Sequence, residues 1–197
     1  MIRFRFVPEK MVATLTFLAQ RVPDLDAMKT VKLLFFADRA HLRKYGRPIL
    51  GDTYYGLEHG PVPSATYDVI KEAFYQTGEN VSADTMDLLA EYSDVDRSGE
   101  RPRFVARKNP DMDWLSASDI EALEETLQQL GAKSALDLRT LAHEQPEIQY
   151  ADDQRRTLNK KSVPIPFNLL FDQEDPETLE AVESAQEERD FAESLLW

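Results

Sequence analysis

Side chains that could bind an acidic partner recur at steps of three and four residues along one segment of the sequence. They are Lys29, Lys32, Phe36, Arg39 and Arg43. On an α-helix this spacing places them on one face, as a basic stripe with an aromatic ring inside it. Such a stripe is either a solvated helix face or a docking surface for another protein, for the chain's own acidic tail or for a nucleic-acid backbone. Because arginine and aromatic residues are enriched in protein interfaces, the composition favours a protein partner.

A second set of polar side chains close to the stripe suggests metal chemistry. Asp38 and His41 are three residues apart on the same predicted helix, and His59 follows Glu58 beyond the next turn. A metal-assisted hydrolase would use Asp38, His41 and His59 as its three ligands. Against this, the chain has only three histidines, and adjacent residues of an extended segment, such as Glu58 and His59, point in opposite directions. The other interpretation makes Asp38 and His41 a local hydrogen-bonded pair that fixes the following turn.

Two other sequence motifs of catalytic sites are either incomplete or absent. The segment from Gly46 to Gly51 has the glycine spacing of a phosphate-binding loop, but it follows a helix and is followed by Asp52, whose charge would repel phosphate. We therefore predict a tight turn there. No serine lies in a Gly-x-Ser-x-Gly elbow. The residues thus predict a protein that is not an enzyme and needs no cofactor, with the metal-assisted hydrolase as the alternative.

The charge of the chain is unevenly distributed. The sequence holds 36 acidic and 23 basic residues, a net charge of −13. From Asp172 to the C-terminus there are ten acidic residues and one arginine, so this tail carries −9 and the rest of the chain carries −4. Charge complementarity suggests that the acidic tail folds back onto the basic stripe until a partner displaces it. Deletion of residues 172–197 would then tighten partner binding.

Composition also restricts where the protein is expected to work. The chain has no cysteine, which fits a reducing cytosol better than an export compartment. No secretory signal is evident in the first residues, and no run of about 18 apolar residues is present to span a bilayer. We expect a cytoplasmic protein without a membrane partner. Nucleic acid is an unfavourable partner because the net charge repels a phosphate backbone.

The elements that must position these residues follow from hydrophobic periodicity and capping signals. Apolar residues repeat at helical spacing in six segments, which are 8–22, 26–45, 61–78, 118–131, 135–144 and 176–197. The apolar run from Leu33 to Ala37 predicts that the second helix is buried centrally. Strands are predicted at 1–7, 51–60, 88–95 and 103–107, the last two as a hairpin. The predicted class is α+β, mostly helical, with five or six helices around a small antiparallel sheet.

Several motifs in combination resemble a known family. The motifs are the run from Lys32 to Tyr45, Gly46-Arg-Pro-Ile, Gly51-Asp-Thr-Tyr-Tyr and Gly60-Pro-Val-Pro. Together they resemble the Panacea antitoxin domain, the SocA-like and phage-associated GepA-like group. The similarity is best over residues 28–75 and extends from 8 to 150. It implies a Panacea-like domain over residues 1–150, followed by a C-terminal extension, residues 151–197, with an acidic helix.

The resemblance implies an antitoxin of a bacterial or phage toxin–antitoxin system. Such a protein neutralises a cognate toxin by direct protein–protein binding, and a role as an adaptor that delivers the toxin to a protease is also implied. A DNA-binding autoregulator that uses the basic stripe is a further alternative. We expect the toxin-binding surface to combine the helix of the stripe with the strand and turn that follow it. The residues predicted to bind the partner are Lys32, Arg39, His41, Arg43, Tyr55 and His59.

Overall fold

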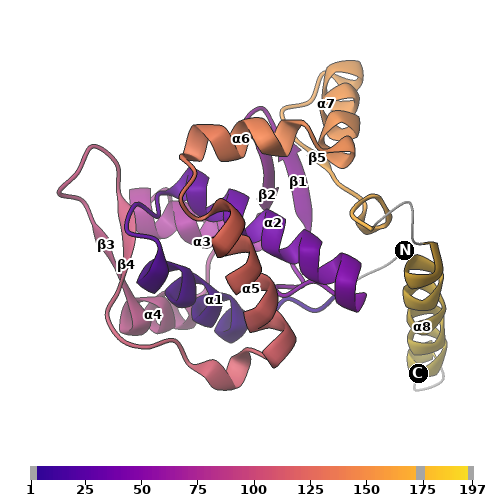
Figure 1. The fold of residues 1–197 in the computed structure, drawn as a ribbon, viewed down its shortest axis with the longest axis horizontal. Helices are drawn as coiled ribbons and strands as arrows, with labels where there is room; N and C mark the ends of the chain where they lie inside the picture. Colours follow the sequence, from indigo (N-terminus) through magenta and orange to yellow (C-terminus); the bar gives the residue numbers. More distant parts are fainter. Residues whose placement is uncertain (1–3, 172–175, 195–197) are drawn as a thin grey trace.

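The computed structural model describes residues 4–171 and 176–194, with side chains described as far as residue 187. Within these residues the chain forms eight α-helices and five β-strands, so the α+β class is confirmed (Figure 1). The helices are α1 (Pro8–Arg21), α2 (Ala27–Tyr45), α3 (Ser64–Tyr75), α4 (Ala83–Tyr92), α5 (Ala117–Leu130), α6 (Ala135–His143), α7 (Pro146–Leu158) and α8 (Pro176–Ser194). The strands are β1 (Tyr54–Leu57), β2 (Gly60–Pro63), β3 (Ser93–Asp96), β4 (Arg103–Ala106) and β5 (Val163–Pro164).

The prediction of five or six helices was too low, because two helices bury too few side chains to show a clear period. In α4 only Thr85 and Leu89 are buried, and the helix is started by the Ser82 hydroxyl, which accepts a hydrogen bond from the Thr85 amide. This helix occupies most of the segment predicted as a strand over 88–95. The strand begins only at Ser93. In α7 the only buried apolar residues among those described are Ile148 and Ala151, although Pro146 at its start is a favourable first helical residue.

The strand predicted over residues 1–7 is wrong for the part that the structure describes. Residues 4–7 belong to no strand, although Val7 has an extended conformation, and residues 1–3 lie outside the described part of the chain. The apolar side chains responsible for the alternation pack on other elements instead. The Phe4 ring lies edge-on against the Phe167 ring, with 4.9 Å between the ring centroids.

Two small antiparallel sheets are present among the described strands. The larger has the order β2-β1-β5, with Tyr55 opposite Val62 and Gly56 opposite Val163. The smaller is the β3–β4 hairpin, whose Phe104 amide donates a hydrogen bond to the Leu25 carbonyl just before α2. The larger sheet packs on α2 through β2, whereas the hairpin packs mainly on α1, and α2 passes through the centre of the molecule (Figure 1).

The central burial predicted for the second helix is confirmed. Leu33, Leu34 and Phe35 are at most 1 % exposed. The helix ends where Gly46 adopts a left-handed conformation, φ 69°, which glycine reaches without a steric penalty. Gly51 also has a positive φ, so the segment from Gly46 to Gly51 is the tight turn that was predicted. No helix in the described ranges is both long and apolar enough to cross a membrane.

The residues after 150 pack with the preceding part of the chain as far as Phe171. α7 runs through residue 150, and β5 pairs with β1. The acidic helix α8 lies at the edge of the molecule (Figure 1). Its Leu179 and Val182 side chains pack on a hydrophobic cluster that includes Leu42 and Phe171. The contact between this tail helix and the end of α2 therefore includes apolar side chains.

Candidate binding groove

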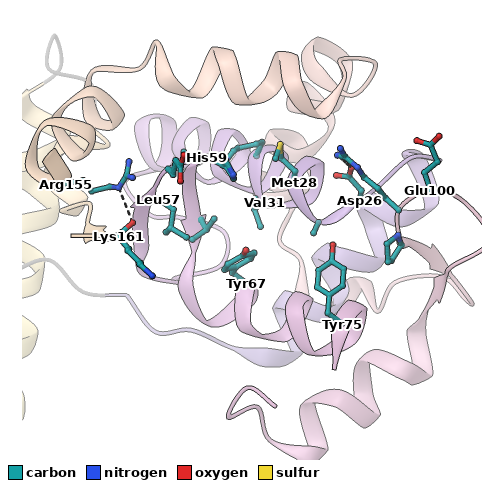
Figure 2. A pocket seen from close by; sticks show the side chains of 17 residues that line it. Asp26, Met28, Val31, Leu57, His59, Tyr67, Tyr75, Glu100, Arg155 and Lys161 are labelled. Atoms are coloured by element: carbon teal, nitrogen blue, oxygen red, sulfur yellow. Dashed lines mark hydrogen bonds and ion pairs between the residues drawn. The ribbon is translucent and has the colours of Figure 1, made fainter. Parts of the chain in front are cut away.

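A groove of about 780 Å³ lies where four elements of the domain meet. Its walls come from the first half of α2, the turn between β1 and β2, α3, and the loop between β3 and β4, and residues around α7 and β5 line it as well. Figure 2 shows Arg155 and Lys161 at one end, Leu57, Tyr67 and Val31 along the middle, and Asp26 and Glu100 at the other end. A concave site of this volume with an apolar middle and polar ends is typical of ligand and peptide sites.

Lys32 projects from α2 into the wall of the groove and is only 1 % exposed. Its ammonium donates a hydrogen bond to the Pro61 carbonyl oxygen at 2.8 Å. Within the described residues it forms no ion pair with a carboxylate. Burial lowers the pKa of Lys32 to about 7, and the nearby charge of Arg139 adds to the effect. The site therefore contains a buried amine whose charged form is poorly solvated.

Gly60 permits the close approach between the β1–β2 turn and Lys32. Its φ of +91° is a conformation that residues with a side chain rarely adopt. A Cβ atom at this position would lie 3.2 Å from the Lys32 Nζ and 3.5 Å from the His143 Nε2. The ammonium and the imidazole thus converge on one glycine from α2 and α6.

One ring nitrogen of His143 contacts a residue of α7, and the other has no hydrogen-bond partner among the described residues. Its Nδ1 lies 2.8 Å from a carboxylate oxygen of Asp152, whose other oxygen accepts a hydrogen bond from Arg155 at 3.0 Å. The His143 Nε2 is buried and has no hydrogen-bond partner in the described part of the protein. Two nitrogen atoms with unused hydrogen-bonding capacity, Lys32 Nζ and His143 Nε2, therefore lie beside the groove.

Of the six residues predicted to bind the partner, Lys32 and His59 line this groove. His59 is exposed in the turn between β1 and β2. Glu58 lies in the same turn and also lines the groove, so the expectation that it and His59 point in opposite directions along a strand does not hold. Tyr55 is half-buried and borders a separate surface hollow with Asp52 and Thr53.

Arg39 and Arg43 hold neighbouring segments in place and do not line the groove. The Arg39 guanidinium lies 2.5 Å from the carboxylate of Glu147, which is buried at the start of α7. The Arg43 guanidinium donates to the Leu170 carbonyl oxygen at 2.9 Å. Lys29 is also buried and pairs with Asp24 at 2.7 Å. The basic stripe predicted on the helix is thus largely internal, because segments from other parts of the chain fold over it.

His41 and Asp38 fix the turn after α2, as predicted, but their hydrogen bonds go to the turn and not to each other. Asp38 accepts hydrogen bonds from the Ile49 and Leu50 amides at 2.7 and 3.1 Å and from the Tyr54 hydroxyl at 2.9 Å. His41 donates from Nδ1 to the Arg47 carbonyl oxygen at 2.5 Å. Burial raises the pKa of Asp38 to about 7 and lowers the pKa of His41, since both charged forms are poorly solvated.

The structure does not bring together Asp38, His41 and His59, the three residues of the metal-site alternative. Asp38 and His41 are buried against the turn, whereas His59 is exposed in the groove. Across residues 4–171 and the described part of α8, no group of three His, Asp or Glu side chains is placed to hold a metal ion.

Sequence reasoning missed several groove residues because they come from separate elements. Met28 and Val31 looked like ordinary core positions of α2, and Tyr67 and Tyr75 like positions of α3. His143 was not among the residues predicted to bind the partner, because its contact with Asp152 joins two separate helices. One usable signal was Gly60 at the turn of the β1–β2 hairpin, since a glycine there often marks a close approach of the backbone.

A family model described as antitoxin SocA-like, Panacea domain, matches residues 31–147. No curated protein matches the chain, and no solved structure does. The matched segment begins within α2 and ends at the start of α7, so it contains most of the groove and excludes α1 and α8.

Proposed function

The chain belongs to the SocA-like antitoxin family with a Panacea domain, and on that premise we propose that it is an antitoxin that neutralises a cognate protein toxin by binding it directly. The observation that carries the proposal is the family match over more than half of the chain. On this proposal the protein works by occupying a surface of the toxin and performs no catalysis. It acts in the cytoplasm of a bacterial cell, where the toxin has its effect.

We place the toxin-binding surface at the groove between α2, the β1–β2 turn and α3. Lys32 and His59, two of the predicted residues, line it. Tyr75, which is 54 % exposed, stands at its margin and is a suitable aromatic anchor (Figure 2). The middle of the groove is apolar, which suits the well-packed centre of a protein interface. Arg39, His41 and Arg43 contribute indirectly, because they hold the elements that form and support the groove.

The autoregulator alternative receives no support from the described surface. It required a basic stripe facing DNA, but Lys29 is paired with Asp24 and Arg39 with Glu147. The role of protease adaptor stays a prediction of the family resemblance.

Co-expression in bacteria tests the proposed function. A gene that neighbours this one, toxic when expressed alone, should be tolerated when this protein is expressed with it, and the two proteins should co-purify. Tyr75→Ala should weaken that protection because it removes the aromatic margin of the groove. Tyr150→Ala is the matched control, since Tyr150 is 43 % exposed on α7 and does not line the groove.

Two results would contradict this proposal. If no neighbouring gene product is toxic or bound, the antitoxin function is wrong. If Tyr75→Ala and Tyr150→Ala protect equally well while circular dichroism shows that both are folded, the toxin is bound elsewhere.

A further inference from the structure

The end of the groove beside α7 carries an excess of positive charge. Lys32, Arg155 and Lys161 supply three cationic side chains there, and Glu58 and Asp152 are the nearby acids. Asp152 is already engaged by Arg155 and by His143. The Lys161 side chain is exposed and makes no ion pair within the described residues. An anion that entered this end would therefore meet cations whose charge is not yet balanced.

The excess of positive charge is energetically unfavourable when no ligand is bound, because the Lys32 side chain is buried. An ammonium has three N–H donors, and the Lys32 side chain uses one of them on the Pro61 carbonyl oxygen. A buried charge without a counter-ion is unfavourable, so a ligand that brings the opposite charge recovers free energy that the empty site lacks. The titratable and charged groups near Lys32 are Arg139 and His143 on α6 and Glu58 and His59 in the β1–β2 turn, and the charge of Arg139 favours an anion there.

The rest of the groove restricts what kind of anion fits. Its middle is lined by Met28, Val31 and Tyr67 (Figure 2). At its far end the carboxylates of Asp26 and Glu100 outnumber one cation, the Arg101 guanidinium, which lies 3.4 Å from Asp26. An extended polyanion such as a nucleic-acid strand would be repelled at that far end and poorly solvated in the middle. A segment with one acidic residue next to apolar residues satisfies both parts of the groove.

We infer that the end of the groove beside Lys32 and Lys161 binds a carboxylate, and that an acidic side chain of the toxin supplies it. The carboxylate completes the unused donors of the Lys32 ammonium and pairs with the Lys161 ammonium, while apolar toxin residues cover the middle of the groove. The identity of the partner in this inference rests on the proposed function. The preference for a carboxylate is independent of the proposed function.

The carboxylate preference is tested on the full chain without a toxin, with acetate as the probe. In protein labelled with 13C-lysine, the Cε resonance of Lys32 is followed through a pH titration, and Lys32→Met identifies the resonance. Acetate should raise the apparent pKa of Lys32 because it stabilises the charged amine. Sodium chloride at the same ionic strength is the control and should leave the titration in place. A titration midpoint that is the same in acetate and chloride would overturn the inference.

The source of the carboxylate is tested by toxin binding, measured by calorimetry with matched lysine variants. Lys161→Glu should weaken toxin binding about tenfold or more, because it places like charge against the toxin's acid. Lys160→Glu changes the net charge equally at an exposed neighbour that does not line the groove, and it should have little effect. Equal losses from the two variants would reject the toxin as the source.

The two tests separate the inference from the proposed function. An acetate effect without any toxin bound would support the carboxylate site and reject the antitoxin proposal. A toxin that is neutralised with equal strength by the Lys160→Glu and Lys161→Glu variants would support the antitoxin proposal and reject the assignment of this end of the groove.

Discussion

Asp38 is expected to make the stability of this protein fall as the pH rises toward neutrality. Its carboxyl group is buried between α2 and the following turn, where it accepts hydrogen bonds from two backbone amides and from the Tyr54 hydroxyl. Burial raises its pKa to about 7 from the ordinary value of 3.8. The folded protein therefore keeps a proton that the unfolded chain releases in the mildly acidic range. Asp38→Asn is the informative change because the amide is neutral at every pH and nearly the same size.

The size of the effect follows from the difference between the two pKa values. Between pH 4 and 7 the native state binds one more proton at this site than the unfolded state, so stability decreases with rising pH. Each pH unit is worth about 1.4 kcal/mol, which gives a loss of about 4 kcal/mol across the window between the ordinary and the raised pKa of Asp38. Above about pH 7 both states have lost the proton, and this contribution becomes constant. In the Asp38→Asn variant the side-chain amide oxygen can still accept the backbone hydrogen bonds, so the variant should fold.

Urea unfolding of the wild type and Asp38→Asn at several pH values between 4.5 and 8 measures this contribution. The free energy of unfolding of the wild type minus that of the variant should fall by about 1.4 kcal/mol per pH unit up to about pH 7 and then level off. Asp137→Asn is a control of opposite sign, because the Ser134 hydroxyl and amide lower the pKa of Asp137 at the start of α6. A difference for Asp38→Asn that does not change with pH would refute the reasoning.

Two further changes test the groove and the tail. Gly60→Ala should lower the free energy of unfolding by more than about 1 kcal/mol, and by more than Gly78→Ala, in chemical denaturation. Both glycines have a positive φ, but a Cβ at Gly60 would press on Lys32 whereas nothing lies within 4 Å of one at Gly78. Equal losses would show that strain alone decides the cost. Deletion of residues 172–197 should leave toxin affinity unchanged in calorimetry, because no described residue of α8 lines the groove. A tighter complex would instead support the idea that the acidic tail masks the binding surface.

Local signals in the sequence located most of the helices correctly. The Ser134 cap forms a capping box with Asp137, and Gly46 ends α2 in a left-handed conformation. The helix predicted over 118–131 starts slightly earlier, at Ala117, since Ser116 forms the capping box with Asp119. The Ser118 hydroxyl instead lies 3.0 Å from the His41 Nε2. A serine can serve either purpose, and its neighbours in sequence do not distinguish them.

The sequence by itself determined the α+β class, the central burial of α2 and the tight turn after it, because periodicity, caps and turn residues act over a few neighbouring positions. Only the tertiary structure decided which polar side chains line the candidate groove. Arg39 and Arg43 looked exposed until Glu147 and Leu170, more than 100 residues away, were brought against them. Lys32 remains a candidate binding residue because the fold buries it without placing a described carboxylate beside its ammonium. Whether a charge is paired depends on which distant segments pack beside it, and helical spacing carries no information about that.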